Sequence, residues 1–149
     1  SDAIDIDFSS GSIKDLSIAY SGNDGLDFSG SDVTAQNIEI INSGDKGLSV
    51  GERTTLSINN LIINGSKVGV ASKDSSLIEI NNVSIDNSTY AFAGFQKKLE
   101  YSPSKSKLIN YSSNSDNFNY LLGYGSTLSI DNNIKKSNYD NNSISDLLY

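Results

Sequence analysis

Apolar and polar residues alternate in short runs along most of this chain. Asp5 lies between Ile4 and Ile6, and Asp27 occupies the same place in the run Leu26–Ser29. Alternation with a period of two is typical of β-strands that bury one face, so we expect Asp5 and Asp27 to point outward. Two more alternating runs follow before the next copy of the pattern, which predicts three short strands separated by turns.

The pattern recurs at a fixed interval. Four consecutive units, 3–24, 25–46, 47–68 and 69–90, are each 22 residues long with no gap between them. A fixed period of about 20 residues is the signature of a solenoid, in which each repeat contacts only its neighbours. Three short strands per unit predict an all-β fold, a parallel β-helix with 22-residue coils. We expect a right-handed one, following the general rule for parallel crossovers.

The length of 149 residues allows one domain, 1–149, with about six coils. The repeat loosens after residue 91. We expect an inserted loop at residues 102–119, which contain the only proline of the chain, Pro103. Residues 135–149 are polar and rich in Asn until the last three, which predicts a cap or a frayed tail. Ser1–Asp2 matches Asn23–Asp24 one period later, so we expect a fragment of a longer β-helix or a chain that stacks on another subunit.

One polar residue recurs between the second and third predicted strands of each unit. Stacked amides at this place would form hydrogen bonds from coil to coil, so we interpret the column as a ladder inside the β-helix. Its members are Asp15, Asn37, Asn60 and Asn82.

Composition excludes several classes of function. The chain has no Cys, His, Met or Trp, which excludes disulfides, thiolate or imidazole metal sites and histidine-based acid–base chemistry. A net charge of −7 argues against binding to nucleic acid. No apolar run approaches the roughly 20 residues of a membrane span. The abundance of Asn, Ser and Asp favours an exported or cell-surface bacterial protein.

The first coils are acidic. Asp27 should stand one coil above Asp5, and Asp24 one coil above Asp2, at a strand spacing of about 4.8 Å. Carboxylates this close repel each other unless a cation offsets them, and oxygen clusters bind calcium. The group Asp2, Asp5, Asp24 and Asp27 is therefore a candidate calcium site. The alternative is a solvated acidic face without a cofactor, whose Asp residues stabilise turns.

Lysines enter the same columns further along the chain. Lys46 replaces Asp24 one coil on, and Lys73 follows on the next coil. An acidic pocket beside a lysine suits removal of a sugar-ring proton next to a carboxylate, with Lys46 or Lys73 as the base. The alternative is a set of salt bridges between coils. The candidate binding residues on this face are Asp24, Asp27, Asp45, Glu52 and Asp74.

A basic and aromatic rim follows. Lys97, Lys98 and Tyr101 belong to the stretch where the repeat loosens. They could meet a glycan, with a sugar face on the Tyr ring, or they could simply keep a loop soluble.

At GNDGLDFSGSDV and GDKGLSVG the chain resembles the pectin-degrading right-handed β-helix enzymes, especially polygalacturonases. Asn23, Asp24 and Gly25 match part of their Asn-x-Asp-Gly segment, and Asp45 matches the start of their acidic pair. Lys46 stands where the second acid belongs, and their histidine is missing. Inverting hydrolysis needs two flanking carboxyl groups, so this resemblance implies the fold and not the activity.

The chain also resembles, over residues 1–128, a poorly characterised group of bacterial right-handed parallel β-helix repeat proteins. The segments that carry this resemblance are SDAIDIDF, GNDGLDFSGS, GDKGLSVGE, GVASKD and FQKKLEYSP. It implies a pectin-lyase-like fold in an envelope or polysaccharide setting, and no established reaction.

Three functions remain open. The leading expectation is a noncatalytic module of an exported or surface protein that binds polysaccharide or serves as a scaffold. The second is a lyase or epimerase that acts on uronates with a cation and a lysine base. The third is a structural stack that associates end to end or with further domains of a longer protein.

Overall fold

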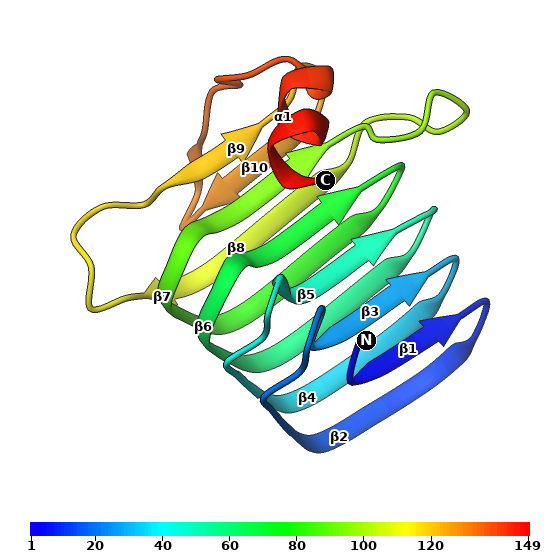
Figure 1. Cartoon of the computed structure of the whole chain (residues 1–149), viewed down its shortest axis with the longest axis vertical. Helices are drawn as coiled ribbons and strands as arrows, with labels where there is room; N and C mark the ends of the chain where they lie inside the picture. The colour runs from blue at the N-terminus through cyan, green and yellow to red at the C-terminus, as the bar shows by residue number, and fades with distance from the viewer.

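The chain forms a parallel β-helix, described by a computed structural model that covers residues 1–149 (Figure 1). Strands one period apart pair in parallel, and successive first strands carry the stack through six coils. The 22-residue period and the fold predicted from the alternation are confirmed. The elements are β1 (Ile4–Asp7), β2 (Ser10–Ala19), β3 (Leu26–Ser29), β4 (Asp32–Ile41), β5 (Lys46–Gly51), β6 (Thr55–Lys73), β7 (Leu77–Phe95), β8 (Lys105–Ser112), β9 (Tyr120–Leu122), β10 (Thr127–Ile130), β11 (Asn133–Ile134) and α1 (Asn141–Leu148).

The three predicted strands of a coil are partly fused. β2 and β4 each contain the second and third strands, and β6 and β7 continue into the first strand of the next coil. The chain turns inside these long strands at single residues in the left-handed region, such as Asn37 with φ 57° and Asn82 with φ 59°. Asn adopts this conformation at lower cost than most residues, which explains its place at the corners.

The polar ladder exists, but on the outside. Asn37 Nδ2 donates to Asp15 Oδ1 at 2.9 Å, and Asn60 Nδ2 donates to Asn37 Oδ1 at 2.9 Å. The expectation of an internal ladder is wrong, because Asp15, Asn37, Asn60 and Asn82 are all exposed. At a left-handed corner the side chain leaves the coil outward, so the amides stack along an edge of the solenoid rather than in its core.

The extra residues of the fifth coil lie earlier than expected. Leu77 pairs with Lys105 and Phe92 with Tyr120, which are both 28 residues apart instead of 22. The six additional residues therefore fall between Phe95 and Lys105. The predicted loop 102–119 is wrong at its centre, because β8 occupies residues 105–112 and continues the stack.

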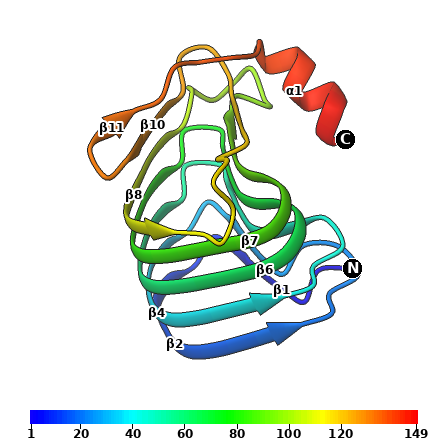
Figure 2. The ribbon, with the colours of Figure 1, turned by 90° about the vertical axis from the view of Figure 1, so that its left-hand side faces the viewer.

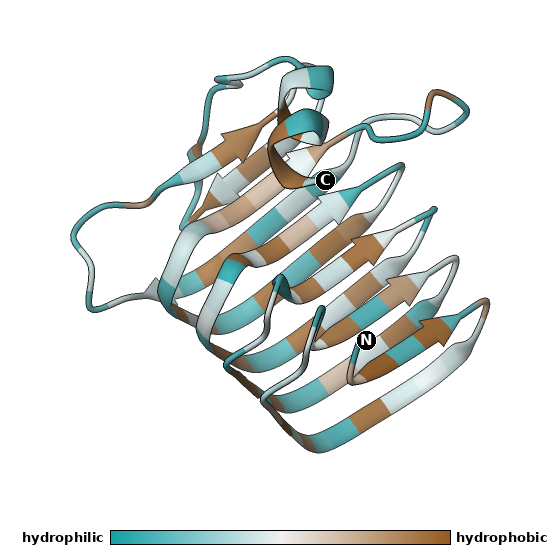
Figure 3. Cartoon of the chain, in the orientation of Figure 1, coloured by the Kyte–Doolittle hydropathy of each residue, from teal (hydrophilic) through white to brown (hydrophobic).

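The core is a continuous column of stacked aliphatic and aromatic side chains. Figure 3 colours the ribbon by hydropathy, and brown bands recur on successive coils between teal or white ones. Leu26, Leu48, Val70 and Phe92 follow one another in register, and each is fully buried. Glycines precede the first three members of this column, where the backbone of the next coil approaches closely, and Ala91 precedes the fourth. A Cβ at Gly25 would lie 2.7 Å from the Gly47 carbonyl oxygen.

A column of hydroxyl groups at the first corner was missed by the sequence reasoning. Thr54 Oγ1 accepts the backbone N–H of Ser31 at 3.1 Å, and Ser126 Oγ accepts that of Ser104 at 3.1 Å. All four residues are buried. A Ser or Thr recurs at this place in each coil, so the signal was present, but Ser is too common in this chain to make the column stand out.

The last residues of the chain, from β11 through α1, depart from the coil pattern. β11 pairs with β10 in the antiparallel direction, and α1 packs outside the coils, against the strands rather than over their end (Figure 2). The segment expected to be a cap or tail thus contains a short helix. α1, the single helix, has eight residues and is too short to span a membrane.

The hydroxyl column generates a prediction on stability. Thr54→Val removes the acceptor of the Ser31 N–H and leaves a buried donor unpaired, which should lower the free energy of unfolding by about 1–3 kcal/mol. Urea denaturation measures the change. Thr55→Val is the matched control, since Thr55 is exposed and accepts no such bond. Equal effects of the two substitutions would contradict a structural role for the column.

Candidate functional site

The candidate site residues gather around the outward side of the first strands, which we call the first-strand face. One outward residue from each coil stacks along it, in a continuous register. The column begins acidic, passes through Ser49, and ends apolar. Its members are Asp5, Asp27, Ser49, Ala71, Ala93 and Leu121.

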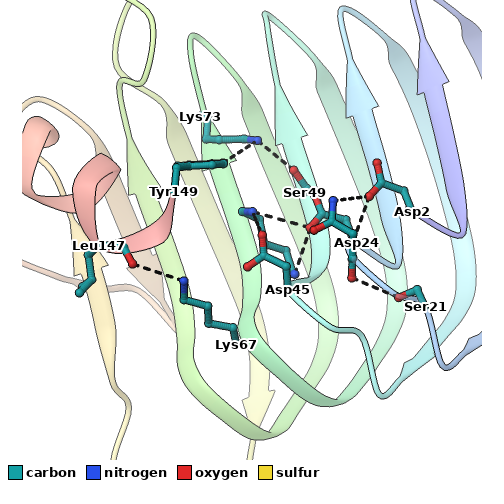
Figure 4. A network of polar contacts seen from close by, with 11 residues as sticks. Asp2, Ser21, Asp24, Asp45, Ser49, Lys67, Lys73, Leu147 and Tyr149 are labelled. Carbon is teal, nitrogen blue, oxygen red and sulfur yellow. Dashed lines mark hydrogen bonds and ion pairs between the residues drawn. The ribbon is translucent and has the colours of Figure 1, made fainter.

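A second column, just before the first strands, links three coils through carboxylates. Asp2 Oδ1 accepts the backbone N–H of Asp24 at 3.0 Å, and Asp24 Oδ1 accepts the backbone N–H of Lys46 at 3.1 Å (Figure 4). The sequence prediction that Asp2 and Asp24 stack is confirmed. Each carboxylate therefore satisfies a backbone donor of the next coil, which is a structural role.

Lys46 is buried among acids. Its side chain is 2% exposed, its Nζ lies 3.7 Å from Asp24 Oδ1, and it donates a hydrogen bond to Asp45. Burial alone would lower the pKa of Lys46, but the hydrogen bond to Asp45 and the nearby charges raise it. A lysine that removes a proton from a sugar needs a lowered pKa and access to the sugar. The geometry therefore does not favour Lys46 as a base and favours the salt-bridge interpretation.

Lys73 is held in a similar way. Its Nζ donates to Ser49 Oγ at 2.9 Å and lies 3.4 Å from the hydroxyl of Tyr149. Ser49 is fully buried beneath it. The two candidate bases thus lie on the same face, but both are engaged in contacts within the protein.

The acidic end brings three carboxylates together. One oxygen each from Asp2, Asp24 and Asp27 lies within 4.8 Å of the others, whereas Asp5 stays outside this group although it pairs with Asp27 in register. Calcium takes about six to eight oxygen ligands. Three carboxylates, one of them already beside the Lys46 ammonium, fit this ion poorly. The structure thus brings together three of the four expected carboxylates and leaves Asp5 outside the group.

Asp74 anchors the additional loop of the fifth coil. It is buried, and its Oδ1 accepts the backbone N–H groups of Lys97 at 2.7 Å and Lys98 at 2.8 Å. Its carboxylate is thus used by the fold and cannot meet a ligand. Asp74 thus joins the candidate first-strand face to the segment that carries Lys97 and Lys98, through backbone contacts that the sequence analysis did not predict.

The basic and aromatic rim forms around the same corner. Lys98 Nζ makes an ion pair with Glu52, and the Arg53 guanidinium lies 5.3 Å from the centre of the Tyr101 ring. Both contacts are at the surface, where such pairs contribute little to stability. Glu52, Lys98 and Tyr101 therefore form a surface cluster separate from the acidic end.

Two residues of the site were missed by the sequence reasoning. Tyr149 places its ring 4.5 Å from Lys46 Nζ and 3.6 Å from Lys97 Nζ. Lys67 Nζ donates to the Leu147 carbonyl oxygen at 3.3 Å (Figure 4). The C-terminal helix thus lies against the first-strand face. These contacts join residues between 52 and 103 positions apart in the chain, and no local pattern in the sequence signals them.

The Lys46 cluster generates a second prediction. Lys46→Met leaves the Asp24 carboxylate buried without its counter-charge, which should lower the free energy of unfolding by about 3–5 kcal/mol. Lys14→Met, at an exposed position, is the control. Adding Asp24→Asn to Lys46→Met should restore part of the loss, as urea denaturation can show. A double variant no more stable than Lys46→Met would contradict a stabilising ion pair between Lys46 and Asp24.

The pKa shifts generate a third prediction, on pH. Burial raises the pKa of Asp24, and desolvation with repulsion from neighbouring carboxylates raises the pKa of Asp5, both from 3.8. Their contribution to stability is thus fully present below pH 3.8 and is lost as pH rises through the folded values. Backbone hydrogen bonds lower the pKa of Asp86 and Asp140, whose contribution is lost only below 3.8.

The melting temperature should therefore rise as pH falls from 7 towards 4 and fall again in stronger acid. Circular dichroism at a series of pH values measures it. Asp5→Asn should flatten the rise. A steady decrease of the melting temperature from pH 7 downward would contradict the assignment.

Comparison with known proteins adds nothing to this picture: no family model, no curated protein and no solved structure matches the chain.

Proposed function

We propose that the chain is a noncatalytic β-helix module that binds polysaccharide through the acidic half of the first-strand face, in an exported or cell-surface bacterial protein. The observation that carries the proposal is that the charged residues of this face differ in whether they are already engaged in contacts within the protein. The lysines suited to catalysis are engaged in structural contacts, whereas Asp5 and Asp27 have no ion pair and remain accessible.

The chemistry of the acidic half of the first-strand face indicates which kind of ligand it can bind. Asp5, Asp7 and Asp27 offer carboxylate oxygens, which accept hydrogen bonds and donate none when ionised. A partner must therefore supply donors, and sugar hydroxyl groups supply them in rows. Carboxylate–hydroxyl hydrogen bonds are charge-assisted and strong. An anionic glycan would be repelled by the same residues, so the proposal is a neutral polysaccharide.

The alternative of a uronate lyase or epimerase is less well supported. It needs a lysine with a lowered pKa and a cation that offsets the uronate. Lys46 has a raised pKa, and its ammonium already faces Asp24 and Asp45. The cation and the base of that mechanism would compete for the same carboxylates.

The proposal predicts how the removal of one charge from the acidic half of the first-strand face affects polysaccharide binding. Asp27→Asn should weaken binding to a neutral polysaccharide about tenfold or more, because a hydrogen bond to a charged group contributes about 1.5–3 kcal/mol. Affinity electrophoresis in gels that contain neutral or acidic polysaccharides measures the retardation of the native protein and of the variant.

Asp32→Asn is the matched control, since Asp32 is also an exposed aspartate but begins β4 on another side of the solenoid. The control should migrate like the native protein in every gel. Retardation by no neutral polysaccharide would contradict the proposal, and so would an equal loss for Asp27→Asn and Asp32→Asn.

A further inference from the structure

The surface beneath α1 has the composition of a docking site for a helix. Ile144 and Leu148 of α1 form one buried cluster with Val68, Ala71, Ala93, Phe95 and Leu121 of the solenoid. Without α1, these five side chains would form an apolar floor on the outside of a β-sheet, where polar residues are the rule. The apolar half of the first-strand face is thus shaped for an apolar partner.

Lysines frame this floor, and three of them have no acidic partner. Lys67, Lys73 and Lys97 make no ion pair with any carboxylate in a protein of net charge −7. Lys73 donates to the Ser49 hydroxyl, and the other partners of these lysines are groups at the end of α1, namely the Leu147 carbonyl oxygen and the hydroxyl and ring of Tyr149. The cations are therefore placed for something electronegative that lies on the floor.

The end of α1 supplies what these lysines attract. The last carbonyl groups of a helix have no partner within the helix, and the helix dipole makes this end negative. α1 carries no basic residue in its last turn, and residues 140–149 contain Asp140 and Asp146 but no Lys or Arg. An acidic amphipathic helix is thus complementary to the surface in both shape and charge.

α1 is weakly secured in this position. It has eight residues, fewer than an isolated helix needs to be stable in water, and only Ile144 and Leu148 are buried. Its first turn is fixed more firmly, since the Asp140 carboxylate accepts the Ser143 N–H at 2.8 Å and the Asn141 side chain accepts the Gln96 N–H at 3.0 Å. Its last turn depends on the lysine contacts and on Leu148.

We infer that this lysine-framed floor is a binding site for an acidic amphipathic helix of a partner protein, and that α1 occupies it within the chain. The partner would place two apolar side chains where Ile144 and Leu148 lie and its negative end among Lys67, Lys73 and Lys97. α1 then competes with the partner for the site. The inference is independent of the polysaccharide proposal, which concerns the opposite half of the face.

The test releases α1 and asks what the vacated surface binds. Leu148→Ser removes a buried side chain from the last turn, and Leu147→Ser makes the same change at an exposed neighbour that is 45% accessible. Hydrogen exchange of the α1 amides should increase in Leu148→Ser and not in Leu147→Ser. If Leu148→Ser alone does not release the helix, Ile144→Ser is added. The strand signal in circular dichroism must persist.

The probe is a synthetic peptide with the sequence of residues 140–149, added to the full-length variants and followed by fluorescence polarisation. It should bind the released variant at least tenfold more tightly than the native protein or Leu147→Ser. The same peptide with Asp146→Lys should bind several-fold more weakly, and so should the native peptide in 0.5 M salt, since salt screens the lysines.

Several outcomes would overturn the inference. The released variant could fail to bind the peptide, or it could bind the acidic and the Asp146→Lys peptides equally. Trigalacturonate, an acidic oligosaccharide, is the second probe, and binding of it without binding of the peptide would show a glycan surface instead. Retardation by neutral polysaccharides is measured in parallel, so that failure of the helix-binding inference is distinguished from failure of the proposal that the acidic half of the first-strand face binds polysaccharide.

Discussion

Parallel pairing between successive coils is the constraint on which the rest of the structure depends. Once residue 26 pairs with residue 48 and residue 48 with residue 70, side chains one period apart must stack at the strand spacing of about 4.8 Å. Each position in the coil then becomes a column. Columns of aliphatic residues make the core, columns of hydroxyls and amides hold the corners, and a column of charges must be balanced between neighbours.

The fold could be predicted from the sequence because a column of like residues appears in the chain as a simple period. The alternation around Asp5 and Asp27 also placed both residues on the outside, as the structure has them. The side to which the Asn ladder points could not be read, because it depends on the left-handed backbone at Asn37 and its equivalents. That conformation has no signature in the spacing.

The candidate site was predicted only in part, for a physical reason. Stacking follows from the period, so the sequence could predict that Asp2 stacks with Asp24 and Asp24 with Lys46. The role of Asp74 depends on the backbone of the additional loop, and the role of Tyr149 depends on where α1 docks. Contacts that fall outside the repeat have no period and must be found in the structure.

The column of Asp2, Asp24 and Lys46 also bears on how the chain folds. Neighbouring coils of a repeat protein resemble one another, so a strand that pairs one whole period away from its proper place would still bury its aliphatic residues. Val68 follows Lys46 in this column, and a shift by one coil would set the Lys46 ammonium in the place of Val68, with its chain neighbour Asp45 but without Asp24 on the adjacent coil. A buried charge whose second partner is present in the native register alone makes mispaired forms costly and favours one order of the repetitive coils.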